Sequence, residues 1–482
     1  MELQFPNINY TAILPEIIIG AFALLVMLIA PFISREKRWL TGHVAWIGVI
    51  AAAASLFSIW GTNTATFAGL YLVDSFSLMF KAVFLLGTLL VIFMSDNFIR
   101  SRLWPAGEFY SLLLFATLGM MMMSSAGDLI VFFIGLEVMS VCLYVLAGFH
   151  REDHKSNEAS IKYFLLGAFA TGFIVFGLAF VYGALGTTSI ATVFSQELFK
   201  FDNSHFYLMF GGAMLLIGLG FKIASFPFHM WVPDVYHGAP TMVTAFMSAG
   251  PKAAAISVLL RVFLYAFSEY SIQLVPIFWA LSILTMFTGN IFAIAQSNVK
   301  RMLAYSSIAH AGYVMIAFSA ASPEAVSAAA FYMLAYTVMN IGAFMVVLTV
   351  EAKEDGDTDF TGFTGLGRRH PILGAVMTLF MISLAGIPPT AGFAAKFYLF
   401  KAAIMQGHVL LAVIAVINSL ISVYYYLRIV VVMFMIDTES EYKPVSYPAF
   451  LYVGLVVAVM GVFALGLFPN VIFPFSAAFL TP

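Results

Sequence analysis

Several ionisable residues stand inside long apolar stretches of this sequence, where a charge is costly to bury. Lys222, Lys252 and Lys396 have apolar residues on both sides, and Glu137 lies near the middle of another apolar run. A charged side chain at the centre of a bilayer costs on the order of 3 kcal/mol on insertion scales, so such residues face a bundle interior or a water-filled cavity. A buried lysine near a carboxylate can take and release a proton. The pattern therefore predicts a proton path, although a structural ion pair between Glu137 and Lys222 is compatible with the same residues.

Two histidines and one tyrosine could assist such a path. His310 lies mid-way along an apolar stretch, with Tyr305 about one turn away. Two interpretations of His310 remain open, a packed and hydrogen-bonded side chain or a bridge through water between lysines. His229 either takes part in the relay or caps broken backbone. We expect no metal at His229 and His237. Asp234 is the one other residue near them in sequence of a type that binds metal ions, which is too few for a site.

The composition is that of a membrane protein. The 482 residues are 62% hydrophobic and 10% charged, whereas a soluble chain is about half apolar and about a quarter charged. The net charge of -2 argues against nucleic acid as a partner. Cys142 is the single cysteine, which excludes a cysteine-ligated cluster or zinc site, and no dinucleotide fingerprint or P-loop is present. We therefore expect neither a cofactor nor a metal in this chain.

Hydropathy predicts an all-α polytopic protein with about fourteen transmembrane helices, forming a single integral membrane domain over residues 1–482. The expected spans are 11–31, 41–60, 73–94, 110–125, 128–149, 158–184, 207–238, 241–266, 274–295, 301–321, 325–350, 371–404, 409–434 and 449–474.

The seventh and twelfth spans are expected to be broken. Each contains two prolines inside the apolar run, Pro227 and Pro233 in the seventh and Pro388 and Pro389 in the twelfth, which interrupt a helix, and each carries one of the buried lysines. Since the twelfth span comes five spans after the seventh, the two cross the membrane in opposite directions, which is typical of inverted repeats with discontinuous helices. We expect helices 4–8, about residues 110–266, and helices 9–13, about residues 274–434, to be two inverted five-helix repeats. Helices 1–3 and 14 would be peripheral.

Basic residues indicate which loops face the cytoplasm. They fall in the loops after odd-numbered spans, and Lys200 is the one basic residue in the other loops. By the positive-inside rule the odd loops are cytoplasmic and both termini are periplasmic. The basic residues of the odd loops are Arg35, Lys37, Arg38, Arg100, Arg102, Arg151, Lys155, Lys300, Arg301, Lys353, Arg368, Arg369 and Lys443.

Three segments resemble a known family. They read FKIASFPFHMWVPDVYHGAPTMVTAFMSAGPKAA, KRMLAYSSIAHAGYVM and LAGIPPTAGFAAKFYLF, and they are similar to the antiporter-like subunits of respiratory complex I and of multi-subunit sodium/proton antiporters. The stretch that begins GLEVMSVCLYVLAGFHREDHKSNEASIKYFLLGAFA resembles more narrowly the subunit N family of bacterial NADH-quinone oxidoreductases. The resemblance covers nearly the whole chain.

The resemblance implies a role for each buried residue. Glu137 would pair with Lys222, Lys252 would be the relay lysine of the eighth span, and Lys396 would be the exit residue. The chain would be a proton-translocating subunit of the membrane arm, in the inner membrane of a bacterium. Other membrane-arm subunits, including homologous antiporter-like ones, would be its partners. NAD, FMN, iron–sulfur clusters and quinone would be bound by partner subunits, which perform the redox chemistry.

Two alternatives remain within the same superfamily. The chain could be a subunit of a multi-subunit sodium/proton antiporter, or of a related membrane-bound hydrogenase. The relay residues alone do not separate these classes, because all of them use such residues. The proteins that accompany the chain would separate them.

Overall fold

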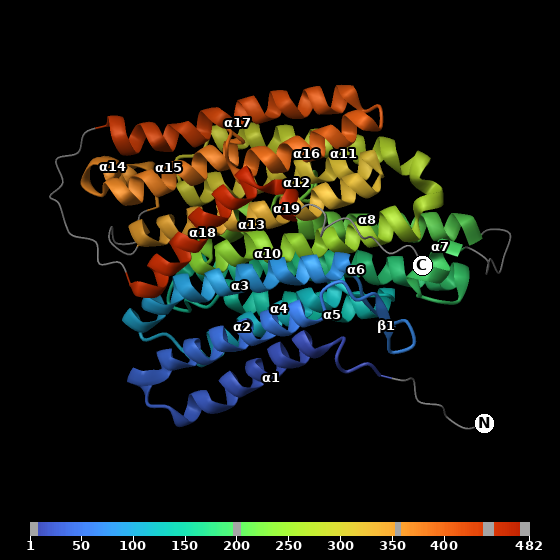
Figure 1. Cartoon of the computed structure of the whole chain (residues 1–482), viewed down its shortest axis with the longest axis horizontal. Coiled ribbons are helices and arrows are strands. Elements are labelled where there is room, and N and C mark those ends of the chain that lie inside the picture. The colour runs from blue at the N-terminus through green and yellow to red at the C-terminus, as the bar shows by residue number, and fades with distance from the viewer. Residues whose placement is uncertain (1–7, 196–203, 352–357, 437–447, 473–482) are drawn as a thin grey trace.

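The chain folds as one bundle of helices. The computed structural model describes residues 8–195, 204–351, 358–436 and 448–472, and their helices lie side by side (Figure 1). Within these ranges, thirteen helices are long and apolar enough to cross a membrane, and a helix pair accounts for one further crossing. The predicted multi-pass helical architecture is therefore confirmed. Lys200, Lys353, Lys443 and the last two residues of the predicted span 449–474 lie outside the described ranges.

The long helices follow the predicted spans within a few residues at most of their ends. They are α1 (Leu14–Ile29), α2 (Thr41–Ser58), α3 (Ser75–Ser101), α4 (Ala106–Ser124), α5 (Leu129–Ala147), α6 (His154–Leu185), α8 (Ser204–Ile223), α10 (Thr241–Leu259), α11 (Ser271–Ile294), α12 (Val299–Ala320), α13 (Pro323–Glu351), α17 (Val409–Met435) and α18 (Ala449–Leu467). The shorter elements are α7 (Ile190–Ser195), α9 (Val232–Gly238), α14 (Leu366–Arg369), α15 (Pro371–Ala385), α16 (Ala391–Met405), α19 (Pro469–Ile472), β1 (Thr64–Thr66) and β2 (Tyr71–Val73).

Three helices form the interior of the bundle. The membrane-spanning windows of α10, α12 and α13 are 100%, 94% and 94% buried, whereas those of α1 and α6 are 33% and 28% buried. The central helices carry Lys252 and His310. Two of the predicted relay residues therefore lie on the helices that are farthest from lipid.

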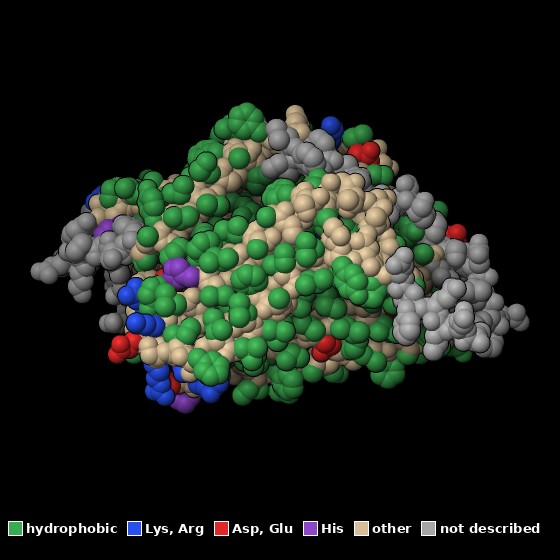
Figure 2. Space-filling view, turned by 60° about the horizontal axis from the view of Figure 1, so that its bottom comes forward, with side chains coloured by type: hydrophobic (Ala, Val, Ile, Leu, Met, Phe, Trp, Pro, Cys, Tyr) green, Lys and Arg blue, Asp and Glu red, His purple; other side chains and the backbone are tan. Residues whose placement is uncertain are grey.

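The surface has the character of a protein that faces a bilayer. Figure 2 shows hydrophobic side chains over the middle of this face, with Lys and Arg gathered toward one end. Large apolar side chains on α6, such as Phe169 and Phe176, are 70% and 65% exposed. A contiguous apolar belt of this kind suits lipid contact, because a soluble surface rarely exposes such a patch.

The break in the seventh span is confirmed between α8 and α9. The backbone groups freed by the break are bonded within the protein, as membrane depth requires. The indole of Trp231 donates to the Phe221 carbonyl over 3.0 Å, and the Phe226 amide donates to the Thr285 hydroxyl over 2.9 Å. These bonds allow the helix to end in the bundle interior.

The break in the twelfth span is confirmed between α15 and α16. Gly386 ends α15 with φ of 86°, a left-handed conformation that favours glycine. A Cβ at this position would also lie 2.9 Å from the side chain of Lys396. Glycine thus lets the lysine fold back over the end of α15.

One local element was not predicted from the sequence. The strands β1 and β2 form a short antiparallel hairpin between α2 and α3. The Leu72 amide donates to the Ser125 carbonyl over 2.7 Å, which ties the hairpin to the end of α4. Strands of three residues are too short for an alternating pattern to stand out in an apolar sequence.

Candidate functional site

Four of the predicted relay residues are buried, each on a different helix. Lys222 on α8, Lys252 on α10, His310 on α12 and Lys396 on α16 are 4%, 2%, 3% and 4% exposed. In the described parts of the chain no carboxylate forms an ion pair with any of the three lysines. Their charged groups are instead held by hydroxyl and carbonyl oxygens.

Lys222 contacts hydroxyl groups of α5. Its amine donates to the Ser140 hydroxyl over 2.8 Å and to the Tyr144 hydroxyl over 3.3 Å. Ser140 and Tyr144 are spaced four apart and therefore share one face of the helix. Neither residue could be identified from the sequence, because nothing in its pattern links them to α8.

Glu137 lies one turn before Ser140 on α5 and is partly buried. Its carboxylate accepts a hydrogen bond of 3.0 Å from the Thr171 hydroxyl on α6. The expected ion pair with Lys222 is not formed among the described residues. Glu137 and Ser140 lie three apart on α5, so the carboxylate and the hydroxyl that holds Lys222 occupy neighbouring positions on one face of this helix.

Lys252 is held by α12. Its amine lies 2.7 Å from the Ser307 hydroxyl and 3.0 Å from the Ser307 carbonyl, and it donates to both. The ring of Tyr236 lies beneath it, with 5.7 Å from the amine to the ring centroid. A cation over an aromatic face gains electrostatic attraction without a counter-ion.

Aromatic rings fill the space between Lys222 and Lys252. Tyr144, Tyr163, Trp231 and Tyr236 follow one another, with ring centroids 4.9, 4.7 and 6.0 Å apart. Within the described residues no continuous chain of hydrogen bonds joins the two lysines. Transfer between them would need water or movement of these rings.

His310 is the centre of a cluster of tyrosines. Its two ring nitrogens lie 2.6 Å from the Tyr332 hydroxyl and 3.0 Å from the Tyr426 hydroxyl. The Tyr426 hydroxyl also shares a hydrogen bond with Ser306, next to the Ser307 that holds Lys252. His310 is thus a hydrogen-bonded residue, and the Tyr426 hydroxyl joins it to Ser306, the sequence neighbour of the serine that holds Lys252.

Tyr305 does not reach this cluster. Its ring packs against Phe292 at 5.6 Å between centroids. The tyrosines that hydrogen-bond to His310 are Tyr332 of α13, the next helix along the chain, and Tyr426 of α17, which is distant in sequence.

Lys396 lies across the break of the twelfth span. Its amine donates to the carbonyls of Leu384 and Ala385 over 3.1 and 2.9 Å, and to the Ser419 hydroxyl over 2.9 Å. The C-terminal end of a helix carries partial negative charge, which favours a cation there. Tyr313 connects this site to the histidine, because its ring lies 4.8 Å from the Lys396 amine and 5.8 Å from the His310 ring.

A cavity of about 530 Å³ adjoins Lys396. It runs between α16 and α17 from Gly386 to Met405, the last residue of α16, and its lining is mostly apolar. Lys396 therefore stands at the inner end of a space that extends toward the turn between these two helices.

His229 stands apart from the relay residues. It is 9% exposed and its ring stacks on Phe226 with centroids 5.9 Å apart. Its Nδ1 atom has no hydrogen-bond partner among the described residues. Trp231, Thr285 and Ser225 supply side-chain hydrogen bonds to the backbone around the break.

The N-terminal part of the bundle holds further buried charges. Glu16 and Lys81 form an ion pair of 2.8 Å, and the Tyr71 hydroxyl donates to Glu16 over 2.8 Å. Arg261 and Asp74 form a second pair at 3.1 Å. The sequence shows these charged residues but not that they pair.

This architecture, with two broken helices and buried lysines beside each break, defines the class of antiporter-like membrane subunits. A family model described as NADH:quinone oxidoreductase/Mrp antiporter, TM, matches residues 126–422. A chain of respiratory complex I from Thermus thermophilus has a TM-score of 0.80 and 34% identity, covering 95% of this chain and 98% of that one. A chain of the membrane-bound sulfane sulfur reductase, an archaeal respiratory membrane complex, has a TM-score of 0.87 and 25% identity, covering 97% and 96%.

Sequence relatives identify the branch of this class. The chain is 45% identical to NADH-quinone oxidoreductase subunit N of Trichlorobacter lovleyi over 475 residues, or 98% of this chain and 97% of that protein. A protein named NADH-quinone oxidoreductase subunit N 1 from Solibacter usitatus is 40% identical over 96% of this chain and 95% of its own length. The chain belongs to the NADH-quinone oxidoreductase subunit N family, as the resemblance predicted.

Proposed function

We propose that this subunit carries protons across the membrane along Lys222, Lys252, His310 and Lys396. Glu137 acts as the charge partner whose movement toward or away from Lys222 changes the proton affinity of that lysine. Protons pass from Lys252 along the hydroxyl groups near His310 and leave from Lys396. This sequence of steps uses every predicted relay residue that the fold buries.

The observation that carries the proposal is the kind of partner that each lysine has. A structural lysine at membrane depth is normally paired with an acid, because an unpaired buried charge is destabilising. Here three lysines are held by neutral oxygens, and each amine can lose its proton without leaving a carboxylate unpaired. That property suits a group that exchanges protons.

Redox chemistry in partner subunits would drive the transfer. NAD, FMN, iron–sulfur clusters and quinone are bound there, and other membrane-arm subunits, including antiporter-like ones, lie beside this chain. The family supports a bacterial inner membrane as its location, with the basic loops in the cytoplasm and both termini in the periplasm. We also propose that α4–α10 and α11–α17 are the two inverted repeats, with α1–α3 and α18 at the periphery.

Lys222→Ala tests the proposal. In a correctly assembled complex in closed vesicles, NADH oxidation should no longer drive proton pumping through this chain. Lys37→Ala is the control, because Lys37 is an exposed lysine outside the proposed path. Full pumping stoichiometry in assembled Lys222→Ala complex would refute the assignment, whereas a loss in both variants would point to assembly and not to the relay.

A further inference from the structure

A polar cavity of about 300 Å³ opens at the end of the bundle that carries the basic loops. Its walls come from the ends and loops after the third, fifth, seventh, ninth and eleventh spans, which are the loops that carry the basic residues. The lining includes both acidic and basic groups, among them His237, Gly238, Lys300, Glu351 and Thr358.

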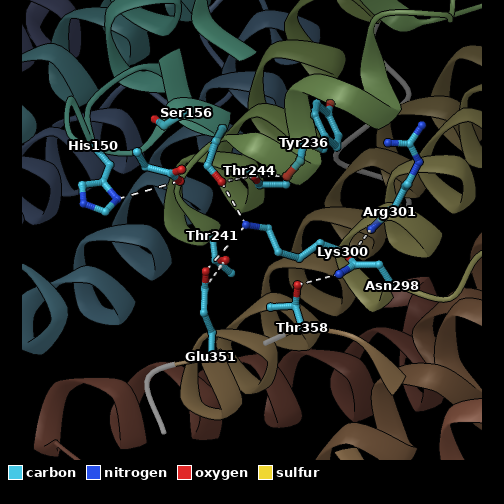
Figure 3. A network of polar contacts seen from close by, with 12 residues as sticks. His150, Ser156, Tyr236, Thr241, Thr244, Asn298, Lys300, Arg301, Glu351 and Thr358 are labelled. Atoms are coloured by element: carbon cyan, nitrogen blue, oxygen red, sulfur yellow. Dashed lines mark hydrogen bonds and ion pairs between the residues drawn. The ribbon is translucent and has the colours of Figure 1, made fainter. Parts of the chain in front are cut away.

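Lys300 and Glu351 form a loose ion pair in the wall of this cavity. Lys300 is 4% exposed, and its amine lies 3.8 Å from a Glu351 carboxylate oxygen and 2.9 Å from the Ala239 carbonyl. The Thr241 hydroxyl donates to the other Glu351 oxygen. Figure 3 shows the Lys300 side chain reaching between Thr244 and Glu351. The Glu16–Lys81 pair of the same protein is closed at 2.8 Å, so the contact of Lys300 is one that can open with little rearrangement.

A single short helix separates the cavity from Lys252. His237 and Gly238 of α9 line the cavity. The residue before them, Tyr236, turns its ring beneath the Lys252 amine and donates its hydroxyl to the Met247 carbonyl over 3.1 Å. The Thr244 hydroxyl donates to the Tyr236 carbonyl over 2.8 Å, so polar groups line the route past α9.

We propose that this cavity is the proton-uptake mouth for Lys252 and that the Lys300–Glu351 pair is its gate. The inference rests on the proposed function, since it supplies the relay with protons from the basic side. With the pair open, a hydronium ion from the bulk gives its proton to water in the mouth and becomes water. The neutral Lys252 amine gains a proton at the other end of the water chain and becomes an ammonium.

A gate is needed because a relay open to both sides at once would let protons flow back. Lys300 and Glu351 lie on α12 and α13, the helices that also carry His310 and its partner Tyr332. A shift between these helices would therefore change the pair and the His310 contacts together. The alternative is that Lys300 only caps the last turn of α9 through the Ala239 carbonyl.

Substitutions test the gate. In the assembled complex, Lys300→Met and Glu351→Gln should each lower the number of protons pumped per NADH several-fold while quinone reduction continues, because a mouth that cannot close lets protons flow back. Pumping at the parent rate in assembled Lys300→Met complex would overturn the inference. If Lys300→Met does not assemble, the accessibility experiment below decides.

Thiol accessibility tests the mouth without removing a charge. Thr358→Cys places a thiol on the cavity wall, and Cys142, the native cysteine of the chain, is buried. A membrane-impermeant cationic thiol reagent, added to inverted vesicles, should modify Thr358→Cys and slow pumping several-fold. The parent chain and Lys37→Cys, on an exposed loop at the same end, should keep their rates. Failure to modify Thr358→Cys, or modification with no slowing, would overturn the inference.

Lys252→Met distinguishes failure of the proposed relay from failure of the proposed proton-uptake mouth. If assembled Lys252→Met complex pumps normally, the relay itself is refuted. If Lys252→Met stops pumping while labelled Thr358→Cys is unaffected, only the mouth is refuted.

Discussion

Glu16→Leu should destabilise the N-terminal part of the bundle through the charge that it leaves behind. Lys81 is 0% exposed, and Glu16 at 2.8 Å is its counter-ion. Removing one partner of a buried pair typically costs about 3–5 kcal/mol, because the remaining charge is buried without compensation. Tyr71 also loses the acceptor of its hydroxyl. We therefore expect a cost in the upper part of this range.

The double variant Glu16→Leu/Lys81→Met should recover most of that loss. Replacing both members of a buried pair by apolar residues of similar size is often neutral or stabilising, because the desolvation cost of both charges disappears. If each single variant loses about 3–5 kcal/mol and the double loses little, the coupling energy is roughly twice the cost of one. Additive losses would refute the reasoning.

The assay compares thermal inactivation of the four complexes, parent, two singles and double, in the same detergent. Lys81→Met should behave like Glu16→Leu, since it leaves Glu16 unpaired. The double variant should also pump at the parent rate, because in the described structure Glu16 and Lys81 contact none of the proposed relay residues. A stable double variant that fails to pump would show that the pair has a role in transfer.

Three further substitutions test the site. Tyr426→Phe removes the hydroxyl between His310 and Ser306 and should slow pumping several-fold, with assembly unchanged on native gels. Gly392→Ala should prevent stable assembly, because its Cβ would lie 1.7 Å from the Ser383 carbonyl of the facing half-helix. Ser307→Asp should hold the proton on Lys252 and slow turnover about 10–150-fold, if a charged hydrogen bond adds about 1.5–3 kcal/mol; Ser307→Asn should keep most of the rate.

The helices, and the burial of the ionisable residues within them, could be predicted from the sequence. A run of about 20 apolar residues has few alternatives in a bilayer, and a proline pair inside such a run breaks the helix. This is why both breaks, and the lysines beside them, could be predicted. The buried state of Lys222 and Lys396 follows from the same reasoning.

The contacts of those lysines could not be predicted, because they join residues far apart in the chain. Ser140 is 82 residues from Lys222, and Tyr426 is 116 residues from His310. Tyr305 is near His310 in sequence, but it lies on another face of α12 and packs on Phe292. Hydroxyl residues are also common within membrane helices, so their type alone does not indicate a role.

The ion-pair partners of the buried acids could not be predicted from the sequence either. Glu137 was expected to pair with Lys222, yet the acids at ion-pair distance from buried cations are Glu16, Asp74 and Glu351, in the described parts of the chain. The pairs of Glu16 and Asp74 lie in the N-terminal part of the bundle and at the end of α10, and the pair of Glu351 with Lys300 lies at the end of the bundle that carries the basic loops. The buried cations outside the relay, Lys81, Arg261 and Lys300, are thus paired with acids, whereas the lysines proposed to exchange protons are held by neutral oxygens. A proton can leave a lysine bound to a hydroxyl without stranding a negative charge, which is why the nature of the partner is the better guide to a relay residue than its depth.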